Sequence, residues 1–238
     1  MPMRKLLPLG FTLICLLAAA EQSAQKVEVS KTEHLDLDAK GTVRLEHSTG
    51  ELTIQGWDQP QVEVITTKST KDPYAAAERE SANRKLDEVH ITAERRQADV
   101  VIDTALPTGL LFGLSRSADG VDVDYHLKIP RQAHLIVQHG DGEVHLEDLA
   151  GDLDVRVHKG LISLRLPEDA KYEVDATTNI GGITSDFAGN ARHRFFHLGN
   201  QFVQTNPANA PKLHFRVGYG DILILKMTAT PATTAPAH

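Results

Sequence analysis

Residues 140–167, GDGEVHLEDLAGDLDVRVHKGLISLRLP, repeat one pattern: a glycine is followed by a segment in which every second residue is aliphatic. Gly142 precedes Val144, and Gly160 precedes Ile162 at the equivalent position of the next copy. Alternation of aliphatic and polar residues is typical of a half-buried β-strand. Glycine adopts positive φ angles at little cost, so these glycines are predicted to turn the chain.

Later copies of the pattern are spaced less evenly. The interval from Ile162 to Ile183, which follows Gly182, is slightly longer than that from Val144 to Ile162, and the interval from Gly182 to Gly220 is longer still. A period of roughly 20 residues predicts an all-β fold, a single-stranded β-solenoid (β-helix-like), in which each coil stacks its inward aliphatic side chains on the coil before. The irregular spacing leaves a β-sandwich open as the alternative.

The same alternation covers most of the chain. Residues 121–129, VDVDYHLKI, place five apolar side chains on one face, and residues 153–157 behave alike. Between residues 42 and 66, the segments TVRLEH, ELTIQG and QVEVIT predict three short strands, the first two separated by a turn at Ser48-Thr49-Gly50.

Helix-forming residues are concentrated in residues 72–89, DPYAAAERESANRKLDEV. Asp72 is expected to cap this helix, and Pro73 suits its first position. The sequence therefore predicts an all-β protein with one short helix.

Three segments are expected along the chain. Residues 1–20 carry Arg4 and Lys5, an apolar run and three alanines, which is typical of an export signal. Residues 21–227 form the β-strand-repeat domain, and residues 228–238 are of low complexity and are predicted to be a disordered tail. No stretch beyond the signal approaches the length of a membrane span.

Cysteine usage and charge narrow the class further. The single cysteine, Cys15, lies in the expected signal without a small residue before it, which argues against a lipid anchor. Without Arg4 and Lys5, 23 basic residues remain against 32 acidic residues, a net charge of about −9. This balance excludes the nucleic-acid-binding class, which needs a basic face. We expect a periplasmic or extracellular protein.

Three stretches together resemble the bacterial putative-adhesin family of uncharacterised β-strand-repeat domains. They are VRLEHSTGELTIQGWDQPQVEVITTK, the run from VDVDYHLKIP to HKGLISL, and VGYGDILIL, which span Thr42 to Leu225. The more specific parts are Gly56-Trp57-Asp58 and Ile129-Pro130. The resemblance implies an exported or envelope-facing β-solenoid and supplies no catalytic residues. This chain departs from the family in the inserted loop LPTGLLFGLSRSADG.

Two pairs of aspartates are candidate ligand-binding or catalytic groups. Asp122 with Asp124, and Asp152 with Asp154, are i and i+2 neighbours, so each pair shares one face of a strand. Each pair is therefore placed to direct two carboxylates at one ligand, as in exported β-solenoid enzymes that cleave polysaccharides, often with calcium. Because they alternate with core aliphatic residues, a solvated outer face is the preferred interpretation.

Histidines are the second group of candidates. His193 and His197 have the spacing of a helical metal pair, but glycine and asparagine on both sides disfavour a helix. His139, His145 and His158 fall on outward or turn positions of neighbouring coils, and surface histidines are the preferred interpretation. The sequence contains neither a G-x-S-x-G nucleophile motif nor a phosphate-binding loop.

Two apolar features are candidates for partner contact. One is the loop with Leu110, Leu111, Phe112 and Leu114, which either contacts a partner or caps an open hydrophobic end. The other is Trp57, which either packs beneath the early turn or stacks on a sugar.

The sequence predicts a non-enzymatic exported envelope protein without a cofactor or metal. Its partner is expected to be a cell-envelope protein or a polysaccharide, bound on an extended β-surface. The alternative is a carbohydrate-active enzyme, a polysaccharide lyase or hydrolase, that uses the four aspartates.

Overall fold

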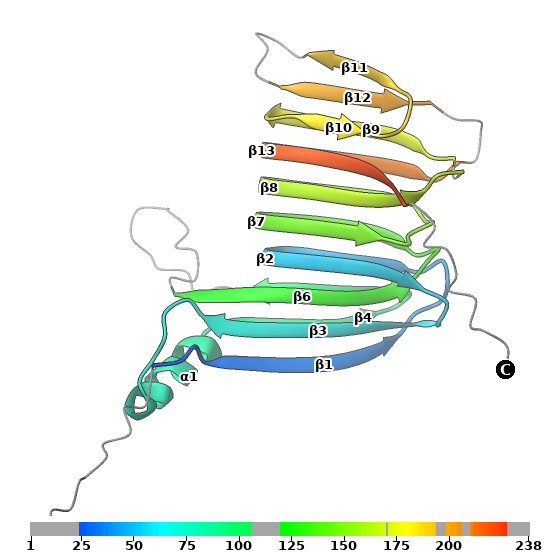
Figure 1. Cartoon of the computed structure of the whole chain (residues 1–238). Coiled ribbons are helices and arrows are strands. Elements are labelled where there is room, and N and C mark those ends of the chain that lie inside the picture. Colours follow the sequence, from blue (N-terminus) through cyan, green and yellow to red (C-terminus); the bar gives the residue numbers. More distant parts are fainter. Residues whose placement is uncertain (1–23, 106–119, 170, 194–198, 206–209, 228–238) are drawn as a thin grey trace, which may run out of the picture.

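The computed structural model describes residues 24–105, 120–169, 171–193, 199–205 and 210–227, and these form an all-β fold with one short α-helix (Figure 1). The described strands belong to one large open sheet. They are β1 (Glu28–Asp36), β2 (Thr42–Trp57), β3 (Gln61–Thr70), β4 (His90–Arg96), β5 (Asp99–Ala105), β6 (Val121–Pro130), β7 (His134–Glu147), β8 (Leu153–Pro167), β9 (Glu173–Ile180), β10 (Ile183–Ser185), β11 (Asn190–His193), β12 (Asn200–Gln204) and β13 (Lys212–Met227).

The sheet is parallel in its middle and antiparallel towards its ends. Its strand order is β1-β3-β6-β2-β7-β8-β13-β9-β12-β11, and β5 and β10 pair with β2 and β13 beside this path. The neighbours from β6 to β9 in this order all pair in parallel. The pairs β1–β3, β3–β6, β9–β12 and β11–β12 are antiparallel.

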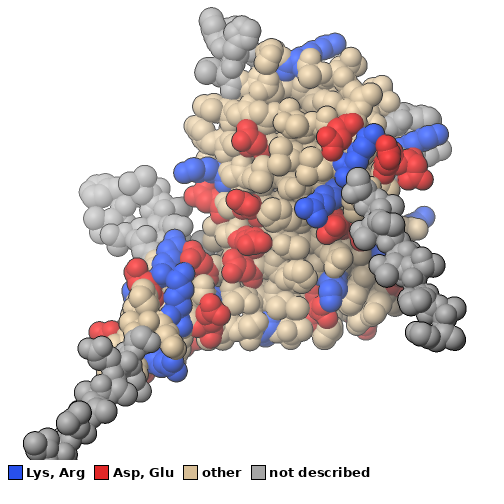
Figure 2. All heavy atoms as spheres, in the orientation of Figure 1, with Lys and Arg blue, Asp and Glu red and all other residues tan. Residues whose placement is uncertain are grey.

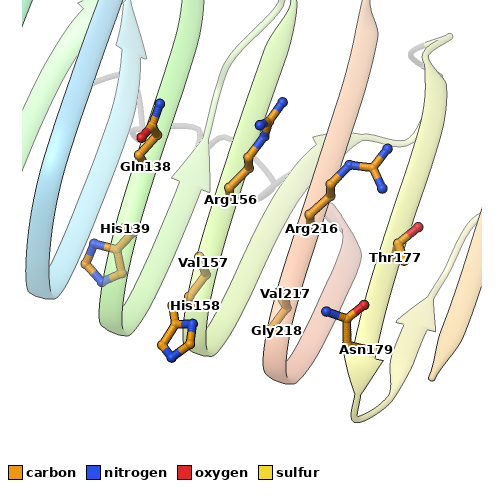
Figure 3. A pocket seen from close by; sticks show the side chains of 10 residues that line it. All are labelled: Gln138, His139, Arg156, Val157, His158, Thr177, Asn179, Arg216, Val217 and Gly218. Carbon is orange, nitrogen blue, oxygen red and sulfur yellow. The ribbon is translucent and has the colours of Figure 1, made fainter. Parts of the chain in front are cut away.

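The four long strands β2, β7, β8 and β13 are each folded at a glycine with positive φ, at Gly50, Gly142, Gly160 and Gly220. We call the residues before this glycine the first arm and those after it the second arm. The glycines stand opposite one another across the strands, and Figure 3 shows the ribbons turning together at this end. A Cβ on Gly160 would overlap the carbonyl oxygen of Gly142. The predicted turning role of the glycines is therefore confirmed.

This folding corrects one expectation. The segments TVRLEH and ELTIQG are the two arms of the single strand β2, and Ser48-Thr49-Gly50 is a corner within it. The register of β2 with β7 shifts at this corner, which accommodates the bend while hydrogen bonding continues on both sides.

The inward rows of both arms form one hydrophobic core. In β8, for example, Leu153 and Val155 of the first arm and Ile162 and Leu164 of the second arm are all buried in this cluster. The alternation predicted for residues 121–129 is confirmed, because all five apolar side chains of that segment are buried. The core thus lies between the two arms of the folded strands.

The repeat found in the sequence is also seen in the pairing, since Val144 of β7 lies opposite Ile162 of β8. The next repeat departs from the simple sequence order. Ile222 of β13 lies between Ile162 and Ile183, because β13 pairs with β8 on one side and with β9 and β10 on the other. Between β9 and β10, the glycine with positive φ is Gly181, at 135°, in place of the expected Gly182. The finer interpretation as a solenoid stays a prediction, with the sandwich as its alternative.

The predicted helix is present but begins later than expected. A 3₁₀ turn covers Ala76–Glu78, and α1 covers Arg79–Asp87. Asp72 is not the cap, because Ala75 holds the N-cap position of the 3₁₀ turn and Glu78 holds that of α1. In the described residues, the structure has no helix of the length and apolar character that crossing a membrane requires.

Candidate binding surface

A polar hollow of about 360 Å³ lies on the outer side of the first arms of β7, β8 and β13, next to β9 (Figure 3). These strands pair in parallel, so equivalent positions on each strand contribute to the same surface. The hollow is lined by Gln138, His139, Arg156, Val157, His158, Thr177, Asn179, Arg216, Val217 and Gly218.

The register places one row of hydrogen-bonding side chains across the hollow. Gln138 lies opposite Arg156, Arg156 opposite Arg216, and Arg216 opposite Thr177. The two arginines project from neighbouring strands, which are about 4.8 Å apart in a sheet. They point outward because Val155, Val157 and their equivalents point into the core. Figure 3 shows Gln138, Arg156 and Arg216 extending side by side.

Two aspartates outside the lining hold these guanidinium groups. Asp154 accepts two hydrogen bonds from Arg156, from Nε to Oδ1 and from Nη2 to Oδ2, both at 3.2 Å. Asp175 Oδ2 lies 3.8 Å from Arg216 Nη2 and 3.6 Å from His214 Nε2. The bidentate pair orients Arg156 firmly, whereas Arg216 has the longer ion pair.

His139 lies at the corner end of the hollow and is only 4% exposed. Its Nε2 is 3.1 Å from the Gly50 carbonyl oxygen, and its Nδ1 is 2.8 Å from Ser48 Oγ. A carbonyl oxygen only accepts, so Nε2 carries the proton and Ser48 donates to Nδ1. Burial lowers the pKa of His139 to about 4, against the opposing effects of the Gly50 hydrogen bond and of Asp141. Ser48 and His139 therefore form a buried neutral pair that fixes the corner.

An exposed aromatic ring stands beside the hollow. Tyr219 is 52% exposed, and its ring meets the ring of His158 edge to face, with centroids 5.9 Å apart. His158 also lines the hollow. An exposed tyrosine beside hydrogen-bonding side chains offers both an apolar face and a polar tip to a ligand.

The four candidate aspartates are not brought together. Asp122 and Asp124 lie on β6, which β2 and β7 separate from β8 and its Asp154. Asp122 lies 3.6 Å from the ammonium of Lys71, and Asp152 accepts a hydrogen bond from the Lys212 backbone at 2.8 Å. The structure thus places the two pairs in separate surroundings.

The candidate histidines are also dispersed. His139 lies opposite Val157, and His145, on the second arm, lies 3.3 Å from Glu143. His193 ends β11, while His197 lies outside the described residues. Within the ranges that the structure describes, no three His, Cys, Asp or Glu side chains are grouped to hold a metal ion.

Trp57 closes a turn. Its indole N–H donates to the Gln61 carbonyl oxygen at 2.8 Å, and the ammonium of Lys128 lies 5.6 Å from the ring centroid. These contacts support packing at the early turn. Trp57 also lines a second hollow of about 300 Å³ together with Pro60 and Pro130. The apolar loop with Leu110, Leu111, Phe112 and Leu114 lies outside the described residues.

Charges are mixed over the face seen in Figure 2. Figure 2 shows lysine and arginine side chains next to aspartate and glutamate side chains at the lower left and at the right, while other residues cover much of the described part of this face. Several form ion pairs, such as Lys128 Nζ with Glu63 Oε1 at 2.8 Å, and the hydrogen bond from Lys128 lowers the pKa of Glu63. Short-range pairing of this kind leaves the described part of the face without a broad area of one sign.

The sequence did not single out Arg156 and Arg216. Both arginines occupy outward positions of alternating segments, and this alternation was the only feature of the sequence that could have pointed to them. They are far apart in the chain, and the pairing of β8 with β13 makes them neighbours.

Comparison with protein-family models gives no match, and comparison with curated proteins gives none either. Solved structures to which this chain is similar include a putative cell adhesion protein from Clostridium sporogenes. It is 14% identical, with 84% of this chain and 100% of that chain covered and a TM-score of 0.46. A putative adhesin from Bacteroides fragilis is 9% identical over 83% and 97% of the two chains, with a TM-score of 0.34.

A third structure, a putative adhesin from Parabacteroides merdae, is 9% identical over 82% and 80% of the two chains, with a TM-score of 0.27. The names of these three proteins agree with the family that the sequence resembles.

Proposed function

We propose that the protein is an exported, non-enzymatic envelope protein that binds a polysaccharide in the hollow over β7, β8, β13 and β9. The observation that carries this proposal is the row formed by Gln138, Arg156, Arg216 and Thr177, in register on four adjacent strands. A sheet that repeats similar side chains at a fixed spacing suits a ligand that is itself a repeating polymer.

The chemistry of the hollow supports a sugar ligand. Gln138, Thr177 and Asn179 are uncharged polar side chains on its walls, and such groups fit the hydroxyl groups of a sugar ring. Tyr219, beside His158, adds an exposed ring on which a sugar is able to stack. The glycine-cornered strands, interpreted as the coils of a β-solenoid, would present this surface as a rigid support.

A non-enzymatic role is favoured over the carbohydrate-active enzyme. The aspartates that the enzyme would use lie on different parts of the sheet, and Asp154 is paired with Arg156. General acid–base chemistry on a glycosidic bond needs two carboxyl groups on either side of one bond. We therefore expect retention of an intact polymer.

The proposal is tested by binding of the purified chain to a panel of neutral and acidic polysaccharides, with Gln138→Ala as the probe of the hollow. We expect this change to weaken binding about fivefold, the effect of one hydrogen bond of about 1 kcal/mol. Tyr219→Ala is expected to weaken it by a similar factor. Gln55→Ala, on the second arm of β2, is the matched control and should leave binding unchanged.

The panel also separates binding from catalysis. New reducing ends or unsaturated products, lost on replacement of Asp154, would favour the enzyme. Failure to bind any polymer of the panel would overturn the proposed function.

A further inference from the structure

We infer that the bound polysaccharide is acidic and that Arg156 and Arg216 bind its carboxylate groups. This inference rests on the proposed function and names the chemical class of the polysaccharide that the same hollow binds. Among the described residues that line the hollow, two carry guanidinium groups and none is an aspartate or a glutamate. The whole chain, in contrast, has a formal net charge of −7.

The two aspartates that pair with these arginines lie outside the lining of the hollow. Asp154 lies two positions before Arg156 on β8. Asp175 lies on β9, opposite His214 of β13, which is two positions before Arg216. Both aspartates therefore sit one outward row away from the arginines. Asp154 uses the Nε and one Nη2 proton of Arg156, whereas a guanidinium has five N–H groups. The aspartates therefore orient the guanidinium groups and leave further donors for an anion.

The arginine side chains are placed for an external ligand. Their side chains are 60% and 51% exposed, and they project side by side from neighbouring strands (Figure 3). The planar guanidinium matches a planar carboxylate through two parallel hydrogen bonds, which a lysine ammonium cannot reproduce. Two such groups on one row suit successive acidic residues of a polymer.

The surrounding side chains favour an acidic sugar over an acidic protein. The exposed Gln138 stands on one side of the arginine pair. On the other side, Thr177 lies on the same row but is only 5% exposed, and the exposed Asn179 follows one outward row further, so uncharged hydrogen-bonding groups stand on both sides of the charge. A uronic acid residue has one carboxylate surrounded by hydroxyl groups. This arrangement matches a pair of arginines flanked by uncharged hydrogen-bonding side chains.

The test compares polygalacturonate with the same polymer after its carboxyl groups are reduced to alcohols, measured by calorimetry on the full chain. Alginate and hyaluronate extend the acidic set, dextran is the neutral reference, and polyglutamate represents an acidic protein. We expect at least one acidic polysaccharide to bind. For polygalacturonate, we expect reduction of the carboxyl groups to weaken binding at least tenfold. Rising salt should weaken binding of the acidic polymers as well.

The double variant Arg156→Gln/Arg216→Gln should lose this preference for the acidic polymer. The double variant Arg156→Lys/Arg216→Lys should keep only part of it, because lysine retains the charge without the planar pair of donors. The matched control is Arg165→Gln, on the second arm of β8, which removes an exposed arginine paired with Glu147 at 3.8 Å. It should leave binding unchanged. Thermal unfolding checks that every variant is folded, and exposed positions make this outcome expected.

The outcomes separate the two proposals. If neutral and acidic polymers bind equally and Gln138→Ala still weakens both, the acidic ligand is wrong and the polysaccharide site stands. If polyglutamate binds as tightly as the acidic polysaccharides, the hollow recognises charge on a protein instead. If no polysaccharide binds, the proposed function itself fails.

Discussion

The two arms of the folded strands share a core but differ on their outer sides. On the first arms, β8 and β13 expose Arg156 and Arg216 beside the hollow. On the second arms, the outward side chains of the same strands include Leu161, Leu223 and Leu225, which are half-buried, together with the exposed Arg165. One strand therefore presents a charged side before its glycine and a more apolar side after it. The core rows maintain the fold on both arms, and only the first arms carry the proposed binding chemistry.

Substitution of the glycine between the two arms is expected to reduce the free energy of unfolding more than any other change proposed here. Gly160→Ala would force a Cβ against the Gly142 carbonyl oxygen at a φ of 141°. We expect a loss of about 4 kcal/mol or more in the free energy of unfolding, because backbone strain is added to overpacking. Denaturant unfolding measures it.

Gly140→Ala is the control for that substitution. Gly140 lies in the neighbouring strand β7, near the corner, but a Cβ there would meet its nearest atom, the Ser48 carbonyl oxygen, at an ordinary 3.5 Å. We expect a change within about 1 kcal/mol. Equal losses at Gly140 and Gly160 would show that the corner does not depend on the positive-φ glycines.

The pH dependence of stability sharpens the comparison at the corner of β7. The folded chain holds His139 with a pKa of about 4, below the ordinary value near 6.5 for the unfolded chain. Between these values the unfolded state binds a proton that the folded state does not, so stability falls as the pH drops from 6.5 to 4. The part of the free energy of unfolding that depends on His139 staying neutral is about 3 kcal/mol. It is fully present above pH 7 and is lost as the pH falls through 4.

His139→Gln isolates this contribution. The variant should be less stable than the original at pH 8, because the hydrogen bonds with Ser48 and Gly50 are altered, but its stability should fall less between pH 7 and pH 4. Parallel pH profiles for the two proteins would mean that His139 is not the buried neutral group described above. Asp141 is the charged neighbour whose effect opposes the lowered pKa, and it is retained in both.

The outer sides of the arms are expected to differ in stability as well as in binding, with the smallest effects of the series. Leu223→Ser should cost about 1 kcal/mol, because part of an apolar side chain is uncovered. Arg156→Gln should change stability by no more than about 0.5 kcal/mol, since its ion pair with Asp154 is exposed. Chemical denaturation of both variants gives the comparison. A larger loss for Arg156→Gln would make this arginine structural.

Much of the fold was predictable from local pattern. Alternation identified the buried rows, since inward positions of a strand must be apolar whatever its neighbours are, and the interval from Val144 to Ile162 gave the register of β7 and β8. Long-range order was not predictable. The placement of β13 between β8 and β9 depends on residues far apart in the chain, which periodicity does not report.

The candidate site illustrates the same limit. The sequence directed attention to aspartates and histidines as residue types, but their usefulness depends on which strands are neighbours. Asp154 proved to be a partner of Arg156, and His139 proved to be buried. The helix start was missed because the residues at the two N-cap positions, Ala75 and Glu78, make no side-chain capping hydrogen bond and so carry no capping signal in the sequence.

The position of β13 has a consequence for the order in which the molecule is completed. β13 is the last described strand, yet it fills a place inside the stack and is the strand with which β10 pairs. While residues 212–227 are still being synthesised, β8 and β9 each have an edge without its final neighbour. Contacts between such distant segments slow folding, and unpaired edges associate with other chains. The chain is therefore most in need of protection from association with other chains until β13 has joined the sheet.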